Sequence, residues 1–214
     1  MRGADGLLWN GLLVLMAGAA LTAGCAGDPN APTSRYLVVS DGAPEAAQPS
    51  AGAVLRVKRP DLAPYLRGEG IVLRTSANTI REARNHLWAE DLASQLGRDL
   101  RHRLASELAG RRVIGPGERA PAKGDDSLVL SVTVDAFQGH FEGYAVVAGD
   151  WRLAEADGEE LASGRFRETR PLSADGYNAL VESLQAAWRG AVGRVINDIR
   201  PHSHPGAATS ADSG

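Results

Sequence analysis

From residue 128 onward the apolar residues follow two successive patterns. They first recur at every second position, and from residue 177 they recur at every third or fourth position. Apolar and polar side chains alternate over residues 128–137, 144–153 and 161–169, as in strands with one face against a core. The pair Asp157–Gly158, between the second and third segments, is typical of a hairpin turn. These segments predict an antiparallel meander. The side chains expected to face its core include Leu130, Val132, Val134, Ala136, Val147, Trp151 and Leu153.

A long amphipathic helix is predicted after the meander. Between Tyr177 and Ile199, apolar residues recur with the i, i+3, i+4, i+7 spacing of one helix face. Ser173 is expected to cap the start of the helix, and Pro201 is expected to end it. The predicted apolar stripe comprises Tyr177, Leu180, Val181, Leu184, Trp188, Ala191, Val192, Val195 and Ile199.

A second helix is predicted earlier, from Trp88 to Ala109, with Gly110 as its C-terminal cap. Leucines recur every four residues, so their stripe drifts slowly around the helix and suits a helix that crosses a twisted sheet obliquely. The leucines are Leu92, Leu96, Leu100, Leu104 and Leu108. The side chains expected in water on the other face are Arg98, Arg101, His102, Arg103 and Glu107.

Three short strands are predicted before this helix, over residues 35–40, 54–58 and 71–75, with breaks at Pro60 and Pro64. The predicted order is therefore β-β-β-α-β-β-β-α. The economical arrangement is an α+β fold, in which a mixed, largely antiparallel sheet packs both long helices on one face. The other face of the sheet would then be polar or would meet a partner.

The only cysteine of the chain, Cys25, ends an apolar segment that runs from Leu7 to Ala23. A short start carrying Arg2, an apolar middle and the small residues before Cys25 form the layout of a bacterial lipoprotein signal peptide. We therefore expect Cys25 to be acylated with fatty chains such as palmitate. Two alternatives are an ordinary secretory signal with a chance cysteine and an uncleaved membrane anchor.

This interpretation divides the chain into four parts. Residues 1–24 would be the removed signal peptide, 25–34 a flexible tether rich in small and polar residues, 35–200 the folded domain and 201–214 a disordered tail. Ala26 follows the cysteine where aspartate, in the enterobacterial sorting rule, holds a lipoprotein in the inner membrane. The outer membrane is therefore favoured.

The sequence gives little support for catalysis. The five histidines (His86, His102, His140, His202 and His204) do not fall into a pattern with serine and a carboxylate that would form a nucleophilic triad. The pairs Asp125–Asp126 and Glu159–Glu160 lie in predicted turns, where solvation is the simpler explanation. His202 and His204 could bind a metal only weakly. We expect no enzymatic activity, cofactor or metal site, and the net charge of −3 gives no basic excess for nucleic acid.

Four segments together resemble a known family. They are the apolar leader ending at Cys25, the run Arg35-Tyr36-Leu37-Val38, the run Leu62–Leu66 that leads into Gly70–Arg74, and the run Leu87–Leu92. Their order and spacing are similar to those of the PqiC-like (YmbA-like) ABC-type transport auxiliary lipoproteins. The resemblance covers about residues 20–200.

The resemblance implies a lipoprotein on the periplasmic side of the outer membrane. It would work with an MCE-domain membrane protein and its ABC transporter, which move lipids between the two membranes and maintain membrane integrity. It also implies a homo-oligomer, with rings associated with the family.

Tyr65, Leu66 and Trp88 are predicted contacts with a partner or a neighbouring subunit, because tyrosine and tryptophan are enriched at interfaces. The alternative for Trp88 is a side chain buried against the start of the helix. The alternative functions are a monomeric lipid carrier with an apolar cavity, a hydrolase, and a structural lipoprotein of the envelope.

Overall fold

The computed structural model describes residues 32–39, 53–108, 111–118 and 127–203. The chain divides after Pro32, and the unit from Thr33 onward contains the fold. The predicted signal peptide, Cys25 and most of the predicted tether lie outside the described residues.

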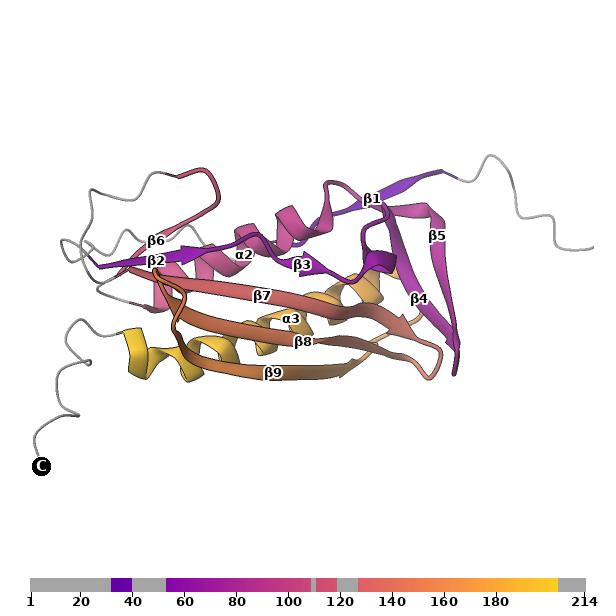
Figure 1. Cartoon of the computed structure of the whole chain (residues 1–214). Coiled ribbons are helices and arrows are strands. Elements are labelled where there is room, and N and C mark those ends of the chain that lie inside the picture. Colours follow the sequence, from indigo (N-terminus) through magenta and orange to yellow (C-terminus); the bar gives the residue numbers. More distant parts are fainter. Residues whose placement is uncertain (1–31, 40–52, 109–110, 119–126, 204–214) are drawn as a thin grey trace, which may run out of the picture. The chain divides into compact units, whose positions relative to one another are not determined.

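Nine strands and two long helices form this unit within the described ranges (Figure 1). The strands are β1 (Ser34–Tyr36), β2 (Val54–Val57), β3 (Asp61–Leu62), β4 (Gly70–Ser76), β5 (Thr79–Trp88), β6 (Arg112–Ile114), β7 (Ser127–His140), β8 (Tyr144–Glu155) and β9 (Glu160–Pro171). The helices are α2 (Leu92–Glu107) and α3 (Tyr177–Ile199), with short 3-10 helices η2 (Pro64–Leu66) and η3 (Arg200–Ser203).

The long strand β7 organises the sheet. On one edge β7 pairs antiparallel with β8, which pairs antiparallel with β9, as the alternating sequence predicted. On its other edge, β2, β3 and β4 pair with β7 one after another, all parallel to it. The hairpin of β4 and β5 continues the sheet, and β1 lies parallel to the end of β5. The predicted fold class, a mixed sheet covered by two helices, is confirmed (Figure 1).

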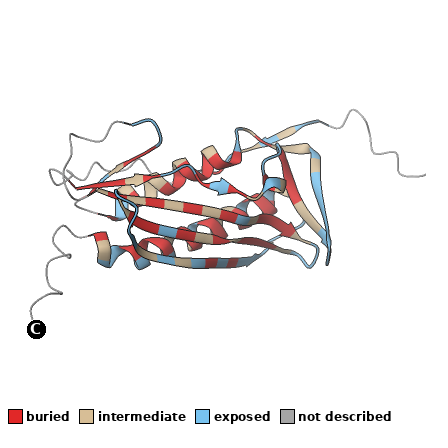
Figure 2. Ribbon diagram, viewed as in Figure 1, coloured by how far each residue is buried: buried red, intermediate tan, exposed pale blue. Residues whose placement is uncertain are grey.

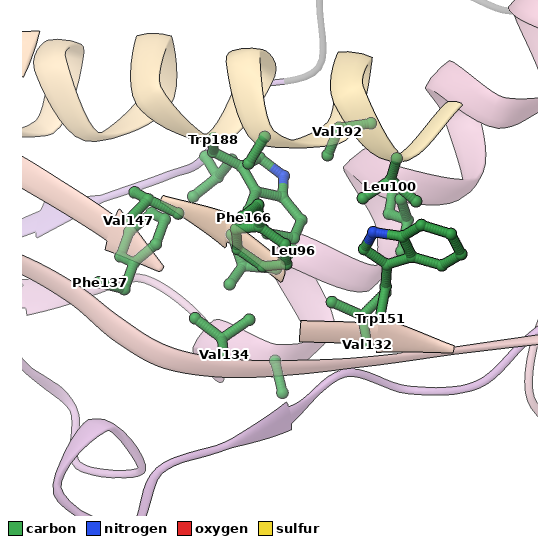
Figure 3. Packing of buried hydrophobic residues seen from close by; sticks show 14 of the residues in the cluster. Leu96, Leu100, Val132, Val134, Phe137, Val147, Trp151, Phe166, Trp188 and Val192 are labelled. Atoms are coloured by element: carbon green, nitrogen blue, oxygen red, sulfur yellow. The ribbon is translucent and has the colours of Figure 1, made fainter. Parts of the chain in front are cut away.

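Aromatic side chains fill the layer between α3 and the sheet (Figure 3). The ring of Trp188 lies edge-on to those of Phe137 and Phe166, with centroid distances of 6.5 Å and 6.3 Å. Phe137 in turn contacts Trp88 at 5.7 Å. The burial pattern follows the predicted alternation along β8, where Val147, Trp151 and Leu153 face the core (Figure 2). Large rings thus fill this part of the interior.

A β-bulge at Asp135 corrects the prediction for the end of β7. Val134 pairs with Gly149 and Ala136 pairs with Ala148, so β7 carries one more residue than β8 between these pairs. The extra residue reverses the alternation. Phe137, rather than the expected Ala136, is therefore the buried side chain after the bulge.

Helix α2 begins later than predicted, and helix α3 has a different N-cap from the one predicted. Helix α2 begins at Leu92 rather than Trp88, because the Asp91 side chain accepts a hydrogen bond from the Ser94 amide at 2.8 Å and caps the first turn. Helix α3 begins at Tyr177 as expected, but its N-cap is Gly176 with φ of 105°, not Ser173. Gly110, the expected cap of α2, lies outside the described residues.

The outer side of α2 is less exposed than predicted. Asp99 is buried and accepts a hydrogen bond from Arg103 at 2.9 Å. His102 is half-buried rather than fully solvated, and its Nδ1 has no hydrogen-bond partner in the part of the chain that the structure describes. The helix is therefore covered on more than its leucine stripe.

The end of the domain also differs from the prediction. Residues 200–203 form η3, where Ser203 is buried and its carbonyl accepts a hydrogen bond from Arg111 Nε at 2.7 Å. The segment predicted to be a disordered tail from residue 201 is therefore folded as far as Ser203. Residues 204–214 lie outside the described part.

Candidate functional site

Two of the three predicted contact residues belong to the core of this chain. Leu66, in η2, is 2% exposed, and Trp88, at the end of β5, is 3% exposed. The Trp88 amide donates to the Glu69 carbonyl at 2.7 Å, which holds the end of β5 against the segment before β4. Side chains buried in this way present no surface to a partner, so the buried alternative describes Trp88 better.

Tyr65 is the predicted contact residue that remains partly exposed. Its hydroxyl donates to the Asp135 carbonyl at 2.6 Å, which ties η2 to the bulge of β7. Burial raises the pKa of the Tyr65 hydroxyl above its ordinary value of 10.0; the nearby Asp135 adds to this rise, and Arg74 opposes it. The residue therefore has a structural role at the bulge, with part of its ring accessible.

Replacing Tyr65 with phenylalanine should remove this hydrogen bond and leave the ring packing intact. We expect the free energy of unfolding to fall by about 1 kcal/mol, the net value of one such bond. Urea unfolding followed by circular dichroism measures it. An unchanged midpoint would show that the hydrogen bond does not stabilise the fold.

The same variant should change the pH dependence of stability. Because the pKa of Tyr65 is higher in the folded chain, its contribution is fully present below pH 10.0 and is lost as the pH rises further. We therefore expect the wild type to lose stability above this pH more steeply than Tyr65→Phe. Parallel slopes in alkaline urea titrations would contradict this. Burial also raises the pKa values of Tyr144 and Tyr177, so the variant removes only part of the effect.

His86 and His140 lie in separate aromatic environments. His86 stacks on Tyr177 with a centroid distance of 3.8 Å, and its Nδ1 lies 3.1 Å from the Tyr36 hydroxyl. His140 lies between the rings of Phe141 and Tyr144, at 4.4 Å and 4.2 Å. These contacts join strands and helix to one another and bring no serine hydroxyl to a histidine.

The serine and carboxylate contacts are local. Ser163 Oγ donates to Glu160 at 2.8 Å, and Ser183 Oγ donates to the Pro171 carbonyl at 3.1 Å. Glu160, one of the paired turn carboxylates, forms an exposed ion pair with Arg152 at 2.6 Å. Asp125, Asp126 and His204 lie outside the described residues. Within the described ranges, no three metal-ligating side chains gather into a site for a metal ion.

A buried carboxylate that the sequence did not reveal links β9 to α3. Glu168 is 5% exposed and accepts from Arg194 Nε at 2.6 Å and Arg170 Nη2 at 3.1 Å. Gly190 on α3 leaves room for the Glu168 carboxylate. A Cβ at position 190 would lie only 3.1 Å from that carboxylate. The only sequence signal was an acidic residue at a core-facing position of the strand. Its arrangement is that of a structural ion pair.

No helix in the described part of the chain has both the length and the apolar character needed to cross a bilayer.

The family model and the related proteins indicate the same family. A family model described as "ABC-type transport auxiliary lipoprotein component" matches residues 36–195. The intermembrane transport lipoprotein PqiC of Escherichia coli K12 is 30% identical over 179 residues, covering 83% of this chain and 91% of PqiC. PqiC of Shigella flexneri matches equally.

Solved structures share the fold. A crystal structure described only as that of an uncharacterized protein is 28% identical, with a TM-score of 0.65, and covers 78% of this chain and 99% of its own. A Xanthomonas campestris protein that is 18% identical has the same TM-score, covers 79% of this chain and 97% of its own, and supports the fold alone. The chain is a PqiC-like protein and belongs to the family of ABC-type transport auxiliary lipoprotein components.

Proposed function

We propose that the chain is an outer-membrane lipoprotein that docks one end of an intermembrane lipid transport system. The observation that carries the proposal is its relation to PqiC, which extends over 83% of this chain and 91% of the relative. Because the match covers nearly the whole relative, the entire lipoprotein is compared rather than one shared domain.

Acylation of Cys25 would provide the attachment. Each buried methylene of an acyl chain contributes about 0.8 kcal/mol, so several chains hold a protein on a bilayer far more firmly than one chain does. The nine residues from Ala26 to Ser34 reach at most about 30 Å when extended, so the domain would stay close to its membrane. Tethering raises the concentration of the domain near a partner that reaches the same membrane.

The packing of the core favours docking over carrying lipid inside the domain. A lipid carrier needs an apolar cavity for acyl chains. Here Trp188, Phe137 and Phe166 occupy the layer between α3 and the sheet. The partners would bind the outer surface instead, where Arg165 and Arg167 of β9 are exposed.

The proposed partners are an MCE-domain membrane protein and its ABC transporter, together with other copies of this chain in a ring. The role is positional and needs neither catalysis nor a cofactor.

The test is affinity purification of the acylated protein, tagged at its C-terminus, from cross-linked membranes of its native host. We expect an MCE-domain protein and an ABC transporter to be recovered with it, and native mass spectrometry to show several copies. A tagged, unrelated outer-membrane lipoprotein is the control. Recovery of single copies that carry lipid and no transport protein would contradict docking and favour the carrier alternative.

A further inference from the structure

The strand registers bring three segments together at one end of the domain. Strand β1 begins with Ser34 opposite His86, near the end of β5 that lies away from the β4–β5 turn, so the chain enters the folded unit beside the open end of this hairpin. Strand β7 ends with His140 beside Arg74 of β4, near the turn of that hairpin. Figure 1 shows the start of β1, the hairpin and the β7–β8 turn at one end, and the β8–β9 turn at the other. The point of chain entry therefore identifies the tether-proximal end.

Two large apolar side chains are exposed at this end. Phe141 in the β7–β8 turn is 54% exposed, and Ile80 on β5 is 46% exposed. Arg74 pairs with both Ile80 and His140, so these residues form one row across three neighbouring strands. With strands about 4.8 Å apart, the two ends of the row lie about 10 Å from each other. Phe141 and Ile80 therefore belong to one surface.

The Phe141 ring is held outward by its neighbours. It stacks on His140 at a centroid distance of 4.4 Å, and Tyr144 stacks on the same imidazole at 4.2 Å. A ring supported by two others keeps its exposed position. Tyrosine favours the boundary between water and hydrocarbon, and phenylalanine is common on the apolar side of elements that lie at this boundary.

Charged side chains of both signs surround this apolar tip. Arg84 is exposed on β5, and Arg74 is half-buried, with its guanidinium donating to the carbonyls of Ser76 and Ala77. Arg81 lies on the opposite face of β5 from Ile80, because successive residues of a strand alternate between faces. Glu142 is 60% exposed and lies 3.5 Å from His140 Nδ1. The exposed apolar side chains, rather than an excess of positive charge, therefore distinguish this tip.

We infer that this end of the domain lies against the bilayer that holds Cys25, with Phe141 and Ile80 in the headgroup region. The inference rests on the proposed acylation of Cys25. The nine-residue tether keeps the start of β1 within about 30 Å of the bilayer. The β8–β9 turn is farther away by the length of the 12-residue strand β8, about 40 Å.

A fluorescent label tests which end meets the lipid. Cys25 is the only cysteine, and acylation consumes its thiol, so a new cysteine can be labelled alone. Full-length acylated Phe141→Cys is labelled with nitrobenzoxadiazole and reconstituted into vesicles of phosphatidylethanolamine and phosphatidylglycerol. Asp157→Cys in the β8–β9 turn is the matched control, and Ile80→Cys is a second probe at the proposed contact.

We expect the labels at positions 141 and 80 to show blue-shifted emission that brominated lipids quench, and the label at position 157 to show neither effect. Intact mass measured first establishes acylation independently. With acylation present, unquenched labels at 141 and 80 would overturn the inference and leave the proposed function standing. A blue shift that depends on protein concentration but resists lipid quenching would mean that a second copy covers the end, and would also overturn it. Absence of acylation would overturn both proposals.

Discussion

Replacing Gly149 with alanine should destabilise the domain by about 3 kcal/mol or more, because the added methyl group has no space. A Cβ at this position would overlap the Thr133 carbonyl oxygen and would lie 2.8 Å from the ring of Phe166. Gly149 pairs with Val134 beside the bulge, where backbone atoms approach closely. A backbone carbonyl in the centre of a sheet cannot move aside as a flexible side chain can. Urea unfolding measures the loss.

Gly193 provides the matched control for the same substitution. It lies within α3, and a Cβ there would meet nothing within 4 Å. Alanine should therefore stabilise the domain by about 0.5–1 kcal/mol, because it restricts the unfolded chain and favours helix. Equal effects of Gly149→Ala and Gly193→Ala would contradict the close packing at the bulge.

Replacing Cys25 with serine should release the protein from the envelope membranes while leaving the domain folded. Serine has no thiol to receive the diacylglyceryl group, so the variant lacks the proposed tether. Cys25 lies outside the described unit that begins at Thr33, so its replacement should not change stability. Fractionation of membranes and soluble periplasm measures the distribution.

The control for this variant is the unfolding curve of the soluble protein, which should match that of the wild-type domain. Full retention of Cys25→Ser on membranes that lack its protein partners would argue against acylation as the tether. The variant should also lose the lipid-quenched fluorescence predicted for a label at position 141.

The elements with one face in the core and the other in water could be predicted from the sequence. The stripe of α3 and the alternation in β8 are direct consequences of burial on one face, so their bounds were close to those observed. Ala136 was placed in the core because alternation was assumed to continue. The bulge at Asp135 breaks it, and no single residue type announces a bulge.

Strands β3, β5 and β6 were not predicted, for a different reason. Only Trp88 of strand β5 is buried, and the pairing of β5 with β4 is irregular, so the strand lacks a buried face to mark it. Trp88 was assigned to the following helix because its neighbours are apolar and fit either structure. The strands β3 and β6 are only two and three residues long, and pairing with β7 and β2 rather than local preference makes them strands.

The surface proposed to meet the bilayer could not be predicted from the sequence. Leu66 and Trp88 lie within recognisable sequence segments because they build the core, and such segments do not separate packing from binding. The exposed Phe141 and Ile80 become neighbours only through the pairing of β5, β4 and β7. Glu168 also meets Arg194 only when α3 packs on β9.

The intact mass of the mature protein, extracted from its own membranes, gives the most direct evidence for the proposed tether. We predict a chain that begins at Cys25 and carries the added mass of a diacylglyceryl group and an amide-linked acyl chain. An N-terminus at another residue, or Cys25 with the mass of a free thiol, would contradict the proposal.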